Sequence, residues 1–270
     1  MSLKNVFNRR NRILLKELVI TDFKLRYQGS ALGYLWSLLK PLMLFAILYV
    51  VFVKFLKFGS DIEHFPVYLL LGIVMWNFFI EATLQGMRAI VDRGDLIRKI
   101  SFPKYIIVVS GTIGALINLI LNLLVVFVFM LINGVDIRIA ILLLPVNILE
   151  LYIFSLAIAF LLAALYVKYR DVSYIWEVLL QGAFYAVPIL YSVNLIVAQS
   201  PVAAKVLMLN PVAQIIQDAR FNAITPESIT TRQLISNPVI SLIPYIIVAV
   251  SIIFAAMYFK KNSRYFAENV

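Results

Sequence analysis

Residues 105–135 read YIIVVSGTIGALINLILNLLVVFVFMLINGV, a run of 31 residues without a charged side chain. A helix needs about 20 predominantly apolar residues to cross the hydrocarbon core of a bilayer, and this run is longer than that. Backbone groups inside a bilayer must also be satisfied within the segment, which a helix achieves. The stretch therefore predicts a transmembrane helix and an all-α integral membrane protein.

The composition of the whole chain agrees with a membrane protein. Of its 270 residues, 63% are hydrophobic and 14% are charged, whereas soluble domains are about 45–50% apolar and about 25% charged. There is no Cys and the one His is His64, which excludes disulfides and thiolate sites and predicts no metal site. The chain also lacks G-x4-GK[ST], GxGxxG, HExxH and an acidic cluster for a prenyl diphosphate. We therefore expect no cofactor in this chain and an energy source outside it.

Apolar stretches separated by charged segments predict six membrane spans. They are residues 32–55, 64–87, 105–132, 139–167, 174–190 and 239–259. The fifth is the least regular, because Gly182 and Pro188 lie inside it and proline interrupts a straight helix.

The basic residues orient these spans. The chain has 24 Lys and Arg against 14 Asp and Glu, a net charge of +10. With the N-terminus inside, segments 1–31, 88–104, 168–173 and 260–270 hold 17 basic residues, and the outer segments hold 6. Cytoplasmic loops carry the excess of Lys and Arg, so both termini are predicted to be cytoplasmic. Topology accounts for the positive charge, and no nucleic-acid partner is expected.

Two cytoplasmic segments have amphipathic sequences. Residues 12–27, RILLKELVITDFKLRY, favour a helix on the membrane surface, although Asp22 interrupts its apolar side and a basic lead-in to the first span explains the segment equally well. The N-terminus lacks the apolar core of a cleavable signal peptide. Residues 91–101 predict a short helix that Pro103 ends. Such a helix suits a groove on a soluble partner, and a solvated charged turn is the alternative.

Two further segments have compositions that suggest roles. Residues 191–238 are too apolar for a disordered loop and predict short amphipathic helices half-sunk in the outer interface, as a gate over a pore exit or as a cap on helix ends. In the cytoplasmic turn, Arg170 and Asp171 are expected to pair and order the chain.

Acidic and aromatic side chains within the spans are the remaining candidates. Glu81 and Glu150 each cost about 2.5–3.5 kcal/mol at a helix centre, so they act either in transport or in helix–helix hydrogen bonds. Glu177 opens the fifth span, where the helix dipole favours it. The aromatic content is 13%, and rings near the ends or middle of spans suit a path for sugars, with interfacial belt or core packing as the alternative. The candidate path residues are Tyr34, Trp36, Tyr49, Phe184, Tyr185 and Tyr191.

A family resemblance rests on motifs spread along the chain. Residues 15–45, LKELVITDFKLRYQGSALGYLWSLLKPLMLF, resemble the opening of type-2 ABC exporter permeases for polysaccharides. The matching positions there are Arg26, Tyr27, Ser30, Leu32, Gly33, Trp36, Pro41 and Leu42, and those downstream are residues 169–172, 188–191, Asn210, Pro211 and Arg220. The similarity covers essentially the whole chain and is closest to the Gram-positive rhamnose-glucose polysaccharide exporters.

The resemblance implies a half-transporter with partners. A six-span domain over residues 32–259, between an N-terminal segment 1–31 and a tail 260–270, would pair with a second copy and with two ATP-binding subunits that hold ATP and Mg²⁺. Residues 12–27 and the helix at 91–101 would contact that ATPase. The coupling candidates on the latter are Arg93, Asp95, Leu96, Arg98 and Lys99.

The resemblance also implies the substrate. Re-entrant helices within 191–238 would form an outer gate, and the path would carry a glycan on undecaprenyl pyrophosphate among membrane lipids. Arg26 and Lys40 would steer the pyrophosphate, although topology and snorkelling explain both equally well. We expect a non-enzymatic transport subunit in the bacterial cytoplasmic membrane. The alternatives are a permease of the same architecture for a drug or simple lipid, or a membrane glycosyl- or acyltransferase.

Overall fold

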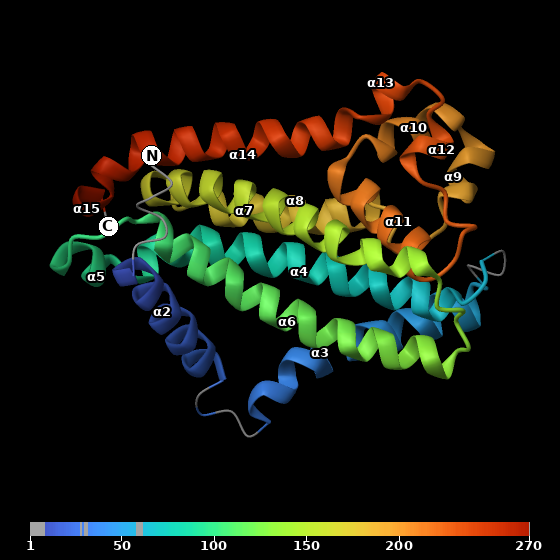
Figure 1. Cartoon of the computed structure of the whole chain (residues 1–270), viewed down its shortest axis with the longest axis horizontal. Coiled ribbons are helices and arrows are strands. Elements are labelled where there is room, and N and C mark those ends of the chain that lie inside the picture. The colour runs from blue at the N-terminus through green and yellow to red at the C-terminus, as the bar shows by residue number, and fades with distance from the viewer. Residues whose placement is uncertain (1–8, 28, 30–31, 58–61, 270) are drawn as a thin grey trace.

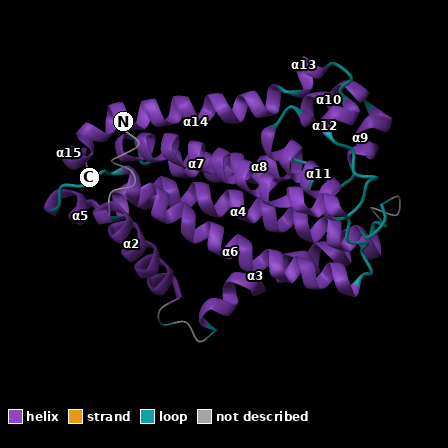
Figure 2. Cartoon of the chain, in the orientation of Figure 1, coloured by secondary structure: helices purple, strands orange, loops and turns teal. Residues whose placement is uncertain are grey.

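The computed structural model describes residues 9–27, 29, 32–57 and 62–269. Within these residues every regular element is a helix and no strand occurs (Figure 2). The predicted all-α architecture is confirmed for the described part of the chain.

Long helices running along one axis form the body of the molecule (Figure 1). They are α4 (Phe65–Asp92), α6 (Tyr105–Ile132), α7 (Leu144–Lys168) and α14 (Ile243–Asn262). Helix α4 packs most extensively on α6 and α7, and α14 covers α7. The core of the protein therefore lies around α4.

Shorter helices complete the two ends of this bundle (Figure 1). One end, here called the α5 end, carries α5 (Gly94–Lys99), η4 (Ser263–Tyr265) and α15 (Phe266–Asn269), and α2 (Arg9–Tyr27) packs on α6 close to it. The opposite α11 end carries α9 (Val193–Gln199), α10 (Pro201–Met208), α11 (Pro211–Ala223), α12 (Thr231–Leu234) and α13 (Pro238–Ser241). The two ends thus differ in the elements that build them.

The first apolar helix lies at the margin of the bundle. It begins with a short 3-10 turn, η1 (Gly33–Leu35), continues as α3 (Trp36–Leu48) and ends in a π-helical stretch, η2 (Tyr49–Phe55). Only 11% of the most apolar 18-residue stretch of this helix is buried, against 78% of the corresponding stretch of α4. A helix that is apolar all round is a core helix when protein covers it. The exposed apolar surface of α3 is available to lipid or to another chain.

Among the described residues, five helices are long and apolar enough to cross a membrane: Trp36–Phe55, Phe65–Asp92, Tyr105–Ile132, Ile139–Lys168 and Ile243–Glu268. The fourth combines the 3-10 helix η3 (Ile139–Leu143) with α7. These helices overlap the first four and the last of the predicted spans. The third predicted span has the same bounds as α6.

The predicted fifth span is shorter than expected. Helix α8 (Val172–Ala186) has 15 residues, which span about 22 Å, less than the roughly 30 Å hydrocarbon core. It ends because the residue before a proline avoids helical geometry, and Val187, before Pro188, is extended. The structure therefore ends this helix four residues before the predicted boundary at 190, and the fifth span, with it the total of six spans, stays a prediction.

The two predicted cytoplasmic helices exist with different bounds. Helix α2 covers the predicted 12–27 and begins three residues earlier. The helix expected over 91–101 is only the six residues of α5, because α4 continues to Asp92 and the backbone turns at Arg93. The predicted helix at 91–101 was therefore too long at both ends.

The outer segment contains short helices, but the expectation of half-sunk helices is wrong for α11. Gln214, Gln217 and Arg220 on this helix are 0% exposed, and α11 packs on α4, α7 and α14. These polar side chains face protein rather than the membrane surface, and those of Gln217 and Arg220 bond to neighbouring elements. Helix α11 is part of the core.

Candidate functional site

The tip of α5 presents most of the predicted coupling residues to the outside. Asp95, Arg98 and Lys99 are exposed and Leu96 is half-buried. The neighbouring Ile97 is 6% exposed and packs in a cluster with Phe259 and Phe266. Helix α5 is therefore anchored by one apolar side chain and offers a charged surface.

Arg93 has a different position from the rest of this set. It forms an ion pair with Asp22 of α2 and donates through Nη1 to Ser110 Oγ of α6 at 3.0 Å. Burial lowers the pKa of Arg93. The residue joins α2, α6 and the α4–α5 junction instead of facing outward. Sequence reasoning missed Asp22 as its partner, although an acid that interrupts an apolar side is a signal for such a contact.

The C-terminal tail supports the same end. Lys104 Nζ donates to the Ser263 carbonyl at 2.6 Å and lies 5.7 Å from the centre of the Phe266 ring. Burial lowers the pKa of Lys104. Phe266 packs edge-on to Phe259 at 5.3 Å. The tail thus closes the cluster that holds Ile97.

The predicted Arg170–Asp171 pairing is wrong, since no ion pair joins these two described residues. Arg170 instead lies over the Tyr166 ring at 5.2 Å, and its carbonyl accepts from Ser173 Oγ at 3.0 Å. The carbonyl of Asp171 accepts from the backbone of Tyr174 at 3.1 Å. Backbone capping of α8, rather than a side-chain pair, orders the turn.

A polar face runs along the centre of the otherwise apolar α4. Asn77, Glu81, Gln85 and Arg88 follow one another at helical spacing, and the first three are partly exposed. At its α5 end, Arg88 pairs with Glu177 of α8 at 2.7 Å. We call these four residues the polar face of α4.

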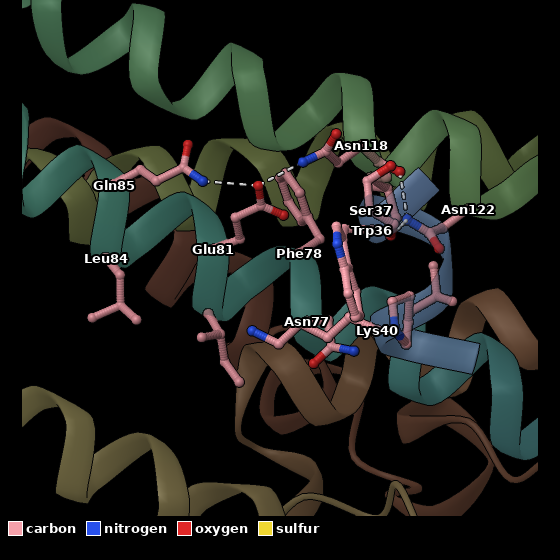
Figure 3. A pocket seen from close by; sticks show the side chains of 14 residues that line it. Trp36, Ser37, Lys40, Asn77, Phe78, Glu81, Leu84, Gln85, Asn118 and Asn122 are labelled. Atoms are coloured by element: carbon pink, nitrogen blue, oxygen red, sulfur yellow. Dashed lines mark hydrogen bonds between the residues drawn. The ribbon is translucent and has the colours of Figure 1, made fainter. Parts of the chain in front are cut away.

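A pocket of about 400 Å³ lies between this face, α3 and α6 (Figure 3). Glu81 accepts hydrogen bonds from Gln85 Nε2 at 2.8 Å and from Asn118 Nδ2 at 2.7 Å. Asn122 Nδ2 donates to the Ser37 carbonyl at 3.1 Å. The pocket, here called the α3–α6 pocket, is lined by Trp36, Ser37, Lys40, Pro41, Val74, Asn77, Phe78, Ile80, Glu81, Leu84, Gln85, Asn118, Leu119 and Asn122. The predicted site residues Trp36 and Lys40 thus line the same pocket as Glu81.

A second pocket, of about 510 Å³, lies between α3, α4 and α8. This α8 pocket is lined by Leu44, Trp76, Asn77, Ile80, Leu84, Glu177, Leu180, Gln181, Phe184 and Tyr185. It shares Asn77, Ile80 and Leu84 with the α3–α6 pocket, so the two adjoin along α4. The predicted path residues Phe184 and Tyr185 lie here, with ring centres 5.3 Å apart.

Two other predicted path residues, Tyr49 and Tyr191, do not line these two pockets. Tyr49 packs on Phe45 at 5.8 Å, and Tyr191 donates to the Tyr185 carbonyl at 2.8 Å. The side chains of Arg26 and Tyr34 lie outside the described residues.

At the α11 end, Arg220 makes three side-chain hydrogen bonds. Sequence reasoning did not identify it as a site residue. It is 0% exposed and donates to three carbonyls: Nε to Tyr68 at 3.0 Å, Nη1 to Pro188 at 2.6 Å and Nη2 to Ile189 at 2.8 Å. Its guanidinium also lies 3.6 Å from the centre of the Tyr68 ring. Arg220 therefore ties the extended segment after α8 to α4 and α11.

The second acid considered from sequence, Glu150, lies in a separate polar group at the α11 end. It lines a pocket of about 360 Å³ with Asp218, Arg232 and Tyr245. Asp218 accepts from Gln214 Nε2 at 2.7 Å and from the Tyr245 hydroxyl at 2.9 Å. The group joins α7, α11 and α14. Among the described residues, no group of three or more His, Cys, Asp or Glu could hold a metal ion.

Comparison with known proteins gives consistent matches. The family described as ABC-2 type transporter matches residues 13–224. The O-antigen export system permease protein RfbA of Myxococcus xanthus is 33% identical over 204 residues, which are 76% of this chain and 77% of that protein. Two O-antigen export system permease proteins RfbA of Klebsiella pneumoniae are each 25% identical over 202 residues, 72% of this chain and 77% of each relative. The family match runs from α2 through α11 and includes the polar face of α4.

Proposed function

This chain belongs to the ABC-2 type transporter family, and on that premise we propose that it exports a polysaccharide linked to undecaprenyl pyrophosphate. It is a multi-pass protein of the bacterial cytoplasmic membrane, and the described part of the chain has five helices able to span a bilayer. The similar proteins of Myxococcus xanthus and Klebsiella pneumoniae are named as O-antigen export permeases, which supports a glycan as the cargo.

The observation that carries the proposal is the polar face of α4. Polar side chains at the middle of a membrane helix are expensive unless they face a polar group or a water-filled cavity. Here they adjoin two pockets of about 400 and 510 Å³. A permease for a hydroxyl-rich substrate needs such a polar route through the hydrocarbon region, and this face would form part of it.

The source of energy is a separate ATP-binding subunit. The chain has no G-x4-GK[ST] sequence for nucleotide phosphates, so ATP and Mg²⁺ would be held by the partner. Two copies of the permease would assemble with two copies of that subunit. In this arrangement α8 would be the remaining span, extended beyond Ala186 by the non-helical residues 187–192.

The α5 end would receive the movement of the ATPase. Its exposed Arg98 and Lys99 lie on a short helix that Ile97 anchors in the cluster with Phe259. The ion pair of Arg93 with Asp22 also links this helix to α2. A push on α5 would therefore pass to α4 and α2 together.

Charge reversal at α5 tests this role. In cells that carry Arg98→Glu or Leu96→Asp, surface glycan should fall by about tenfold or more, because a like-charge or buried-charge contact weakens docking by at least about 1.4 kcal/mol. The purified complex should still hydrolyse ATP. The matched control is Lys205→Glu, an exposed residue of α10 at the opposite end, which should export normally. Unchanged export by both α5 variants would contradict the coupling role.

Substrate identity has its own test. ATP hydrolysis by the reconstituted complex should rise with undecaprenyl-pyrophosphate-linked glycan. Stimulation by a drug or a simple phospholipid alone would instead favour the permease alternative. Turnover of a lipid-linked donor by the permease without any ATPase would favour a transferase.

A further inference from the structure

We propose that the two adjoining pockets on the polar face of α4 form a binding station for uncharged sugar rings of the exported glycan, with Asn77 as a direct contact. The inference rests on the proposed function and adds the site and the part of the substrate that the site recognises. Neither pocket includes Arg93 of the α5 end or Arg220 of the α11 end.

Asn77 is the first reason. It lines both pockets and makes no hydrogen bond to any other residue that the structure describes. Figure 3 shows Glu81, Gln85 and Asn118 joined in one hydrogen-bonded row, with Asn77 lying apart from that row. A carboxamide offers two donors and one acceptor oxygen, and a protein has no packing reason to keep it at the middle of a membrane helix. A ligand in the pocket would give it a partner.

Two buried polar atoms on the pocket walls give the second reason. Asn118 is 4% exposed and its Oδ1 has no hydrogen-bond partner, and Trp76 is 1% exposed and its Nε1 has none. Most buried polar groups in proteins are paired. The first atom is an acceptor beside the α3–α6 pocket, and the second is a donor beside the α8 pocket. Hydroxyl groups can both donate and accept, so sugar hydroxyls match the hydrogen-bonding type of both atoms.

The charges exclude a phosphate as the favoured ligand. The described charged residues that line the α3–α6 pocket are Lys40 and Glu81, of opposite sign. The α8 pocket has Glu177, which Arg88 already pairs at 2.7 Å. A pyrophosphate site needs an excess of donors with positive charge, which these pockets lack. Their balance suits an uncharged ligand.

Aromatic rings and size complete the match. Trp36 lines one pocket, and Phe184 and Tyr185 line the other, so each offers an apolar ring surface beside polar groups. Ligand sites typically measure about 300–1,000 Å³ and combine apolar walls with a few placed polar groups. Volumes of about 400 and 510 Å³ fall in that range. Adjacent pockets that share Asn77 suit consecutive rings of one chain.

The test compares two probes on the permease–ATPase complex in lipid nanodiscs. One probe is undecaprenyl-pyrophosphate-linked glycan extracted from the producing strain, and the other is undecaprenyl pyrophosphate without sugar. The variant is Asn77→Leu, which has similar size and removes no hydrogen bond within the described chain. The measured quantity is the concentration of each probe that gives half-maximal binding, followed by fluorescence of a labelled complex.

Asn77→Leu should raise the half-saturating concentration of the glycan probe about tenfold, as the loss of one or two hydrogen bonds predicts. The half-saturating concentration of the sugar-free probe should stay within about twofold of the wild-type value. Asn77→Gln, which keeps the carboxamide, should restore most of the affinity. Glu81→Gln should weaken the glycan probe as well, whereas Glu150→Gln, outside both pockets, is the matched control and should not.

Equal shifts for both probes, or no shift for the glycan probe, would overturn the inference while leaving the exporter function intact. A wild-type complex that binds the sugar-free probe and the glycan probe equally would also overturn it, since the sugar would then add nothing. A wild-type complex that binds neither probe would refute the proposed function itself.

Discussion

Two arginines, one at each end of the molecule, are withdrawn from water to different degrees and have different partners. Arg93 at the α5 end is paired with the carboxylate of Asp22, and both side chains keep some exposure, 18% and 25%. Arg220 at the α11 end is 0% exposed and forms no ion pair within the described part of the chain. Three carbonyls and the Tyr68 ring surround it instead.

The difference indicates which end is fixed and which can rearrange. Carbonyls bonded to Arg220 belong to the backbone of α4 and of the segment after α8, so the contact cannot open without leaving a buried charge and buried carbonyls unpaired. The Arg93 pair joins side chains near water, where hydration replaces part of a lost contact. The coupling role proposed for the α5 end would require contacts of this second kind.

Removal of the Arg220 guanidinium should have the largest effect. Arg220→Met leaves the carbonyls of Tyr68, Pro188 and Ile189 buried without a donor and should destabilise the protein by about 3–5 kcal/mol. Arg220→Lys should fail to restore stability, because an ammonium lacks the planar fork that reaches all three. Thermal unfolding in detergent measures both variants. A Lys variant with wild-type stability would show that charge alone matters here.

Gly72 of α4 provides a second test of the Arg220 contact, because it lies directly against the guanidinium. A Cβ at this position of α4 would collide with Nη2 of Arg220, so Gly72→Ala should cost about 1–3 kcal/mol by overpacking. Helix propensity alone predicts the reverse, a gain of about 1 kcal/mol. The sign of the change in free energy of unfolding therefore decides between them. Gly182→Ala in α8, where a Cβ meets nothing within 4 Å, is the control and should be neutral or stabilising.

The Asp22–Arg93 pair should give a smaller, salt-dependent effect. Asp22→Asn removes the charge that faces a partly buried guanidinium and should cost about 1–2 kcal/mol, less at high ionic strength. A double-mutant cycle with Arg93→Gln measures the coupling energy, which should approach zero in molar salt. A coupling energy that does not change with salt would show that this pair is a fixed contact, like the Arg220 contacts.

The Arg88–Glu177 pair should matter least for stability. Its side chains are 48% and 40% exposed, and such pairs contribute about 0–1 kcal/mol. Arg88→Gln should therefore shift the unfolding midpoint only slightly. A loss as large as that of Asp22→Asn would mean that the pair is shielded from water in the assembled protein, for example by the second copy.

The sequence decided the membrane class and most span positions, because hydrophobic length is a local property. The uncharged run 105–135 contains α6 with the predicted bounds 105–132. Gly182 and Pro188 predicted an irregular fifth span, and α8 does end at Ala186, two residues before Pro188. The exact length of α5 was not predictable from the local pattern, since it depends on how far the core packing of α4 continues its helix.

Only the tertiary structure decided the roles of the charged and polar side chains. In the sequence, Asp22 interrupts an apolar side and Arg220 counts as one more outer basic residue, but each is placed by contacts to residues more than 70 or 150 positions away. Asn77 is an ordinary polar residue in an apolar stretch until α3, α6 and α8 form pockets on either side of it. Hydrophobicity is a property of each residue and can be judged from the sequence alone, whereas hydrogen bonds and ion pairs depend on which helices pack together.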